Sequence, residues 1–401
     1  MGATIYDQRK SCEMTNGNPP SLPRPEAAAI QASAALCRLI VAEIRDAGGW
    51  IPFSRFMERT LYAPGLGYYS GGAHKFGPGG DFVTAPELTP LFARTLAAQA
   101  AQVLAGSSPE IIEAGAGSGA LAADLLLALE ALGALPDRYR ILELSGELRQ
   151  RQQETLRSRA PHLVPRVEWL DALPQRCSGL VLGNEVLDAM PVALVAWQAE
   201  GIFERGVSLS AAGDFVWADR PAEGELLAAA AQLPVRSPYL SEIGLAARAW
   251  VAEWGRRLDR GALLLIDYGF PRHEYYLPER DCGTLMCHHR HHSHDDPFWL
   301  PGLSDITAHV DFTGIAEAGF NAGLDVLGYT GQAQFLLNCG ITERLEGLKS
   351  AGDRAYLAEA KKVGKLISPA EMGELFKAIA LGRGLAEPLL GFTRGDRVHT
   401  L

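Results

Sequence analysis

An amide and two carboxylates stand close together in residues 184–192, directly after an apolar segment at 179–184. Asn184, Glu185 and Asp188 are the candidate catalytic residues, because the two acids share one side if the turn between them is helical. They could hold a flat, five-donor guanidinium through paired hydrogen bonds. An uncharged substrate would leave two buried carboxylates without partners, which is costly. The competing interpretation is that Asp188 only caps a helix that follows.

A glycine-rich run, residues 113–120, lies between a predicted strand and a predicted helix. Glycines at such a place let backbone N–H groups and the helix N-terminus approach a ligand closely. The run also satisfies the looser dinucleotide pattern G-x-G-x-x-G/A, so by itself it does not distinguish between cofactors. We assign Glu113, Gly115, Gly117 and Gly119 to cofactor binding, and a tight turn without a ligand is the alternative.

Acidic residues also follow the next two predicted strands. Glu143 ends the second strand, where an acid can accept hydrogen bonds from both hydroxyls of a ribose. Asp171 lies where a third strand would end and could face an adenine amino group. We assign both to cofactor binding together with Asn184, and the alternative for each acid is a solvated loop position.

The acidic cluster after the fourth strand helps to decide between a nicotinamide cofactor and S-adenosylmethionine. A dehydrogenase has no evident use for it, and no catalytic hydride partner is found near the glycine-rich run. A methyltransferase needs polar groups there to fix a target nitrogen against the methyl sulfonium. The residues therefore favour S-adenosylmethionine as the cofactor. They leave open a methyltransferase for RNA or a small molecule, and a catalytically silent assembly factor that binds a partner protein.

Strands and helices alternate regularly over most of the chain, which predicts βαβ units and a parallel sheet covered on both faces. The expected fold class is α/β: a Rossmann-like class I methyltransferase sheet with an N-terminal helical and loop extension and insertions in the substrate region. We expect one sheet, with a strand at its edge over residues 376–382. The predicted division is a flexible tail at 1–25, a helical and glycine-rich substrate region at 26–107, and the Rossmann-like domain at 108–401 with insertions at about 197–240 and 270–311.

Two long irregular segments, residues 62–86 and 270–307, are rich in aromatic residues. Functional loops gather at the carboxyl ends of the strands in such sheets. We therefore predict that both segments form the substrate channel. The candidate wall residues are Tyr68, Tyr69, Thr84, Pro86 and Glu87.

The charge and apolar pattern of the chain argue against some classes of binding partner. The formal net charge of −10 argues against a nonspecific nucleic-acid binder, which needs a basic field. No apolar run approaches the ~20 residues that span a bilayer, so no membrane association is expected. The polar, proline-containing N-terminus lacks the pattern of a signal peptide, so a cytoplasmic location is expected. A homodimer is left open.

The cysteines and histidines do not form a recognisable metal framework. The six cysteines are scattered, which favours free thiols. Residues 287–294 hold five of the ten histidines, a density that suggests a metal site. These ligands crowd one irregular segment without two separated pairs, so we predict a solvated loop near the substrate entrance and no metal.

The sequence resembles the MidA-like family of S-adenosylmethionine-dependent methyltransferases, which includes a mitochondrial complex I assembly methyltransferase. The resemblance runs from about residue 51 to the end of the chain and rests on the segments 68–72, 76–88, 113–120, 184–191, 266–269, 283–285, 304–312, 391–392 and 395–396. It implies S-adenosylmethionine binding. Because the mitochondrial member methylates an arginine, it also favours a protein substrate with a target arginine.

Overall fold

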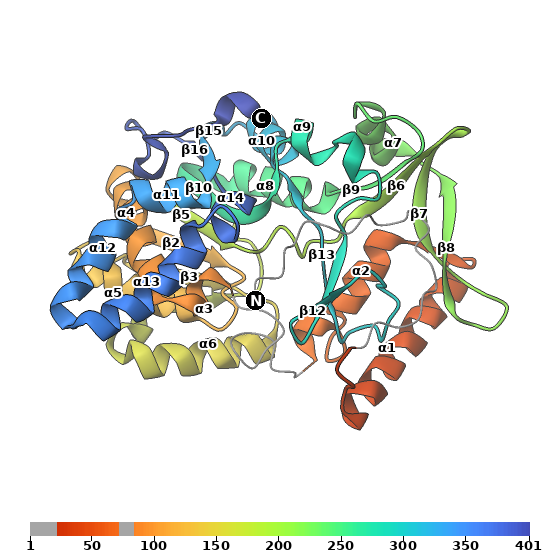
Figure 1. Cartoon of the computed structure of the whole chain (residues 1–401), viewed down its shortest axis with the longest axis horizontal. Helices are drawn as coiled ribbons and strands as arrows, with labels where there is room; N and C mark the ends of the chain where they lie inside the picture. The colour runs from red at the N-terminus through yellow and green to blue at the C-terminus, as the bar shows by residue number, and fades with distance from the viewer. Residues whose placement is uncertain (1–21, 72–83) are drawn as a thin grey trace. The chain divides into compact units, whose positions relative to one another are not determined.

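The computed structural model describes residues 22–71 and 84–401, and this part of the chain divides into two compact units (Figure 1). One unit combines three stretches, residues 22–68, 191–245 and 273–308. The other combines residues 69–190 (of which 72–83 are outside the description), 246–272 and 309–401. The chain thus crosses between the units several times, and three separate sheets replace the single sheet expected from the sequence.

The larger unit is built on an eight-stranded sheet. Seven strands follow the order β15-β16-β10-β5-β2-β3-β4, and the short β14 pairs with β10. The pairs β10–β5, β5–β2, β2–β3 and β3–β4 are parallel, which confirms the Rossmann-like α/β class. The strands are β2 (Glu110–Ala114), β3 (Arg138–Leu142), β4 (Val167–Leu170), β5 (Cys177–Asn184), β10 (Leu258–Phe270), β14 (Val310–Asp311), β15 (Asp325–Gly331) and β16 (Phe376–Arg383).

The last strand is not at the edge of this sheet, so that expectation is wrong. β16 runs antiparallel between β10 and β15. Every residue of β16 except Arg383 is buried, as suits a strand covered on both faces. β16 follows β15 in the sequence but lies between β15 and β10 in the sheet, and the order of the strands along the chain does not reveal this position.

Successive residues of the strands face two different cores, which is why the strands are apolar throughout. Ile111 and Leu264 belong to one hydrophobic cluster, whereas Ile112 and Leu265 belong to the other. The first cluster is covered by α4 (Pro90–Gly106), α5 (Ala120–Ala131), α6 (Gly146–Arg159), α11 (Gln332–Asn338), α12 (Ile341–Gly347) and α13 (Asp353–Ile367). The second is covered by α8 (Leu245–Arg257) and α10 (Phe312–Asn321). Helices therefore cover both faces of the sheet.

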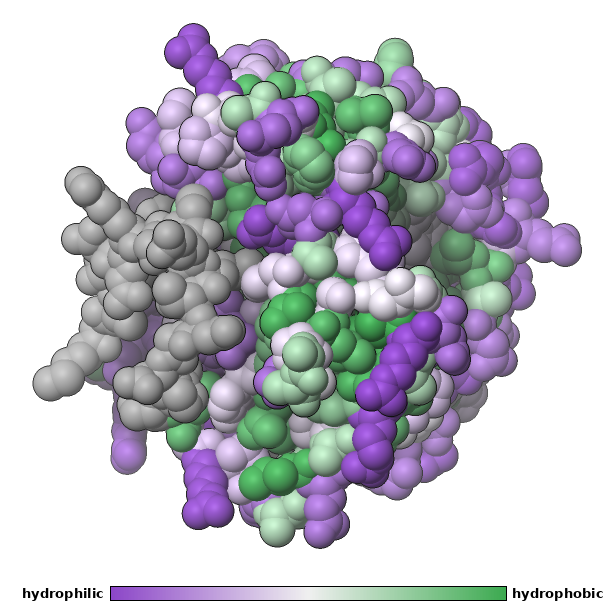
Figure 2. Space-filling model, turned by 90° about the vertical axis from the view of Figure 1, so that its right-hand side faces the viewer, coloured by the Kyte–Doolittle hydropathy of each residue, from purple (hydrophilic) through white to green (hydrophobic). Residues whose placement is uncertain are grey.

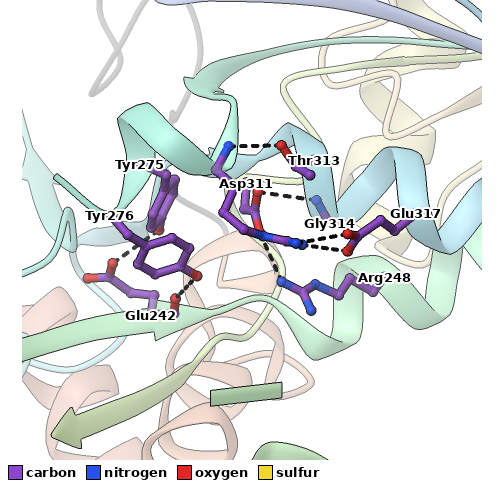
Figure 3. Close-up of polar contacts among 9 residues, drawn as sticks. Glu242, Arg248, Tyr275, Tyr276, Asp311, Thr313, Gly314 and Glu317 are labelled. Atoms are coloured by element: carbon purple, nitrogen blue, oxygen red, sulfur yellow. Dashed lines mark hydrogen bonds and ion pairs between the residues drawn. The ribbon is translucent and has the colours of Figure 1, made fainter. Parts of the chain in front are cut away.

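An ion-pair cluster fixes the end of β10 against α8 and α10 (Figure 3). Asp311 accepts from the Gly314 N–H at 3.1 Å and so caps α10, and it also pairs with Arg248 at 2.9 Å. Arg272 pairs with Glu317, and its backbone N–H donates to the Thr313 hydroxyl. Asp311 belongs to the 304–312 segment of the resemblance, and its contacts stabilise the fold.

The smaller unit contains two sheets of its own. The first has the order β1-β7-β6-β9, with β8 paired to β7, and the second is β12-β11-β13. Figure 2 shows the side that carries β7 and β8, where apolar side chains gather near the middle and hydrophilic ones surround them. The elements are α1 (Ala27–Asp46), β1 (Trp50–Pro52), α2 (Phe53–Tyr62), β6 (Ala193–Gln198), β7 (Gly201–Leu209), β8 (Phe215–Pro221), α7 (Gly224–Ala231), β9 (Tyr239–Ile243), β11 (Met286–His289), β12 (His292–His294) and β13 (Asp305–Thr307). α9 (Arg272–Tyr275) begins where the chain enters this unit.

Aromatic rings and one buried carboxylate organise this unit. Phe56 packs edge-on against Phe298, and Trp217 contacts the same Phe298 ring. Glu242 is 1% exposed and accepts from the backbone N–H of Thr284 at 2.9 Å and of Leu285 at 2.8 Å. Figure 3 shows it beside Tyr275 and Tyr276, whose hydroxyls donate to its carboxylate and its backbone carbonyl. The 283–285 segment of the resemblance therefore anchors a loop on a buried acid.

The histidine-rich segment is a hairpin rather than the solvated loop expected from the sequence. β11 and β12 pair across Arg290 and His291, both at positive φ, as a tight two-residue turn requires. His289 and His294 are buried and contact the same Trp299 ring. Over residues 22–71 and 84–401, no group of three His, Cys, Asp or Glu side chains has the arrangement of a metal site.

Two other expectations need correction. Cys37, Cys177, Cys287 and Cys339 are free thiols as expected, but Cys282 is disulfide-bonded. Cys12 lies outside the described residues. The helix α1 is long and apolar enough to cross a membrane by length and composition, contrary to the expectation that no segment would be. The core helix of a soluble protein and a signal sequence pass the same test; α1 buries Leu36, Ile40 and Ile44, but only 22% of its apolar window is buried.

Candidate active site

The glycine-rich loop joins β2 to α5 in the larger unit. Gly115, Gly117 and Gly119 have φ values of +66°, +52° and +82°, which other residues adopt only with strain. A β-carbon on Gly115 would lie 3.1 Å from Val186 Cγ2, so the loop also passes close to the segment after β5. The loop ends at Ala120, the first residue of a twelve-residue helix whose N-terminal N–H groups can receive an anionic group.

Glu143 follows β3 directly and lies beside this loop. Its Oε1 accepts from the Ser145 N–H at 2.9 Å, and its Oε2 accepts from the Gln152 side chain at 3.0 Å. Burial raises the pKa of Glu143, while these donors act in the opposite direction. Each carboxylate oxygen can accept more than one hydrogen bond, so both keep capacity for the hydroxyls of a ribose.

The other two predicted cofactor acids have different surroundings. Asp171 lies just beyond β4 with its side chain 90% exposed, and it pairs with Arg149 at 2.8 Å. Glu113 is buried in β2 and accepts from the Tyr139 hydroxyl at 2.6 Å. Burial, together with the nearby negative charge of Glu143, raises the pKa of Glu113 to about 7. Both assignments stay predictions, and the bond to Tyr139 gives Glu113 a role inside the sheet.

The segment after β5 brings the catalytic candidates together, but not on a helix. Residues 185–190 form a bend and a turn, and the next element is the strand β6. The helical spacing and the helix cap considered for Asp188 are therefore both wrong. Glu185 has φ +52°, an uncommon value for a residue with a β-carbon. It accepts at Oε1 from Asn184 Nδ2 at 3.0 Å, and Asp188 accepts from the Tyr268 hydroxyl at 2.7 Å.

A third carboxylate, which the sequence did not single out, holds this turn in place. Asp267, near the end of β10, is 1% exposed, and its Oδ2 accepts from the backbone N–H groups of Val186, Leu187 and Asp188 at 3.0, 2.8 and 3.3 Å. Its Oδ1 accepts from the Tyr268 N–H. Burial and the acids Asp188 and Glu185 raise the pKa of Asp267, whereas its four N–H donors favour the ionised form.

The cluster is strongly acidic. Within residues 22–71 and 84–401 neither Glu185 nor Asp188 forms an ion pair, although the buried Lys377 on β16 is the register partner of Asp267. Burial and Asp188 raise the pKa of Glu185 to about 8, and burial raises the pKa of Asp188 to about 6. Asp188 Oδ1 and Asn184 Oδ1 are buried and have no hydrogen-bond partner within residues 22–71 and 84–401. Open acceptors of this kind fit a ligand that brings several N–H donors and a positive charge.

The predicted substrate-channel residues are only partly brought to this cluster. The helix α3 (Ala85–Leu88) begins after Thr84 and contains Pro86; the Ala85 N–H donates to Glu185 Oε1 at 3.4 Å. Glu87 accepts from the Ser118 hydroxyl, so it contacts the glycine-rich loop. Tyr68 is buried in the smaller unit, whereas Tyr69 begins the larger one. Residues 72–83 lie outside the described residues, and the channel stays a prediction.

The arrangement fits S-adenosylmethionine. The glycine-rich loop provides a close backbone approach, Glu143 provides acceptors for ribose hydroxyls, and the unpartnered Asn184 Oδ1 can accept from an amino group. A Rossmann-like sheet carrying such a loop and an acidic cluster after its fourth strand defines a nucleotide-cofactor enzyme that holds a polar substrate at the strand ends. The class indicated by fold and site is a methyltransferase.

Comparison with known proteins supports this class and gives the family. The model of a family described as "Putative S-adenosyl-L-methionine-dependent methyltransferase" matches residues 91–330, more than half of the chain. The chain belongs to this family and is an S-adenosylmethionine-dependent methyltransferase.

Individual relatives agree with that assignment. A crystal structure from Burkholderia thailandensis, described as a "likely methyl transferase" bound to S-adenosyl-homocysteine, is 58% identical, with a TM-score of 0.92 over 95% of this chain and all of that one. A mitochondrial protein arginine methyltransferase from Danio rerio is 28% identical over 82% of this chain and 83% of its own length. The protein of the same name from Mus musculus is 29% identical over 86% of this chain and 84% of its own.

Proposed function

We propose that this methyltransferase acts on a protein and transfers the methyl group to a guanidinium nitrogen of an arginine. The observation that carries the proposal is the acidic cluster at the ends of β5 and β10, where Glu185 and Asp188 have no cationic partner among the described residues. Relatives that are named protein arginine methyltransferases, at 28% and 29% identity, support the same substrate class.

The hydrogen bonds of the two acids leave room for such a substrate. Both hydrogen bonds that Glu185 makes within the described residues reach Oε1, so Oε2 is available to a ligand, as is Asp188 Oδ1, which has no partner among the same residues. A guanidinium is planar and has five N–H donors, so it can donate to both acids and still present one terminal nitrogen to an electrophile. Its positive charge would offset the cost of burying two carboxylates.

The main contribution of Glu185 and Asp188 would be to bind and align the substrate. Bound S-adenosylmethionine supplies an electrophilic methyl group on a sulfonium. Glu185 and Asp188 would orient the guanidinium and localise its charge, so that one nitrogen lies in line with that methyl group. Arginine has a pKa above about 12, so its proton leaves only after attack, when the charge has risen. The carboxylates can then receive it.

The direct test uses proteins from cells that lack the gene. Their extract is incubated with the purified protein and S-adenosylmethionine carrying an isotopically labelled methyl group, and the products are analysed by mass spectrometry. We expect the labelled methyl group on arginine in one or a few proteins. Label confined to RNA, to a small molecule or to lysine would refute arginine as the target while leaving the methyltransferase class intact.

We also expect the rate to rise with pH. Glu185 binds a cation only when it is ionised, and its pKa in the free protein is raised to about 8. At pH 6.5 the protonated form therefore dominates, and the bound cation must displace the proton. The value of kcat/KM for a methylatable arginine peptide should rise about tenfold for each pH unit below about 8 and level off above it. A flat profile between pH 6.5 and 8.5 would contradict this.

A further inference from the structure

One side chain outside the predicted site connects three of its parts. Gln152 lies on α6 and is 0% exposed. Its Nε2 donates to the Gly117 carbonyl at 3.1 Å and to Glu143 Oε2 at 3.0 Å, and its Oε1 accepts from Trp169 Nε1 at 2.9 Å. One amide therefore links the glycine-rich loop, the acid after β3 and the strand β4.

The partners fix the orientation of this amide. An indole N–H can only donate, so Trp169 must face the oxygen of Gln152. A backbone carbonyl and a carboxylate can only accept, so they must face its nitrogen, whose two hydrogens serve one acceptor each. An amide alone among the side chains of this size offers two donors and an acceptor in one plane, so neither leucine nor glutamate can reproduce the three bonds.

The helix itself lies against the loop at this point. A β-carbon on Gly119 would lie 3.0 Å from Gln152 Cα, so a glycine is needed for the loop to pass the helix. One turn further along α6, Thr155 Oγ1 donates to the Ser118 carbonyl at 2.7 Å. The loop is therefore shaped by α6 as well as by its own glycines.

We propose that Gln152 is a positioning residue for S-adenosylmethionine, because it fixes the glycine-rich loop and the Glu143 carboxylate relative to each other. The inference rests on the cofactor site described above. The loop would receive one part of the bound molecule and Glu143 its ribose, so the distance between the two decides whether both contacts form together. Gln152 reaches the cofactor only through these two groups.

Gln152 should also control the charge of Glu143. Burial raises the pKa of Glu143, and the Gln152 amide is one of the donors that oppose this effect. The other charged groups that act on this carboxylate are Arg149 on α6 and Glu113 on β2, and neither would change in a Gln152 variant. Loss of the amide therefore leaves Glu143 protonated at higher pH, where it accepts ribose hydroxyls less well.

The test compares Gln152→Leu with Gln150→Leu by calorimetry with S-adenosylhomocysteine from pH 6 to 8.5. Gln150 is on the same helix but exposed, where it bonds only Glu154 in the described contacts. We expect Gln152→Leu to weaken binding about tenfold to a hundredfold, the range for a lost hydrogen bond to a charged group. The pH below which affinity declines should also move upward. Gln150→Leu should match the unchanged protein in both respects.

Two further variants keep the outcomes distinct. Trp169→Phe removes only the bond that orients the amide, so it should shift affinity and pH profile in the same direction by a smaller factor, even if Gln152→Leu does not fold. Glu143→Gln tests the cofactor site itself. If Glu143→Gln weakens binding while Gln152→Leu and Trp169→Phe leave affinity and pH profile unchanged, the positioning role is refuted. If Glu143→Gln also has no effect, the cofactor site is misplaced.

Discussion

Gly117→Val is expected to abolish S-adenosylhomocysteine binding, with a loss of affinity of more than about a hundredfold, or roughly 2.8 kcal/mol. Gly117 has φ +52°, and a β-branched residue there would strain the backbone or force the loop into another course. The loop would then no longer present its N–H groups where the ligand must lie. Its carbonyl would also leave the Gln152 amide. Calorimetry on the purified variant measures the loss directly.

The matched control is Gly133→Val. Gly133 has φ +66° and is exposed, and a β-carbon there meets nothing within 4 Å. Gly133→Val therefore causes a similar backbone strain but leaves the glycine-rich loop unchanged. We expect both variants to lower the melting temperature by a comparable amount, and only Gly117→Val to lose ligand binding. Unchanged affinity in Gly117→Val would mean that the cofactor binds elsewhere.

The class of the fold was predictable because its signals are local. The unit around β2 and α5, for example, has an apolar strand, a glycine-rich turn and a largely apolar helix close together in the sequence. The place of β16 was not predictable, since its buried residues other than Lys377 are apolar or small, and such a strand has the same sequence pattern at an edge or in the middle of a sheet. The smaller unit was missed for a related reason: three stretches far apart in the sequence build it, and their pairing is a long-range property.

In the candidate site, too, contacts between residues close in the sequence were predictable and long-range contacts were not. Asn184, Glu185 and Asp188 are neighbours in the chain, so their meeting was predictable although their turn is not helical. Asp267 is about 80 residues away from the N–H groups that it accepts from, and only the sheet register brings β10 beside β5. The available signals were an aspartate near the end of an otherwise apolar strand and the place of 266–269 among the segments of the resemblance. Gln152 gave no signal, because a glutamine within a polar helix is usually solvated.

Asp267 also explains how the site keeps three acids together. Its oxygens accept from four backbone N–H groups, three of them in Val186, Leu187 and Asp188, so it acts as the fixed acceptor that holds the turn after Glu185 in place. Glu185 and Asp188 then carry the open acceptors. Asp267 thus stabilises the turn, whereas Glu185 and Asp188 are left to bind the substrate. A substitution at Glu185 therefore tests substrate binding more than folding.

Glu185→Gln is accordingly expected to remove methylation and to keep cofactor binding. The amide oxygen can still accept from Asn184 and from the Ala85 N–H, so the turn should be preserved. The charge that pairs with a guanidinium is lost, and the amide nitrogen presents hydrogens to a group that has only donors. Leaving a buried partner of a charged pair unsatisfied costs about 3–5 kcal/mol, which corresponds to a fall in kcat/KM of roughly 10² to 10³ or more.

Two further measurements serve as controls: the melting temperature of Glu185→Gln, and the activity of a variant far from the site. Burial and Asp188 raise the pKa of Glu185 in the folded protein to about 8, above its ordinary value of 4.5. The folded state therefore binds the proton more tightly, and the stability contributed by this group falls as pH rises from about 4.5 to about 8. Glutamine removes that penalty, so the variant should melt at the same or a higher temperature at pH 8.5. Glu346→Gln, an exposed acid paired with Lys349, should leave activity unchanged. Near-full turnover by a folded Glu185→Gln variant on the identified substrate would show that this carboxylate is structural, and the case for arginine would lose its chemical basis.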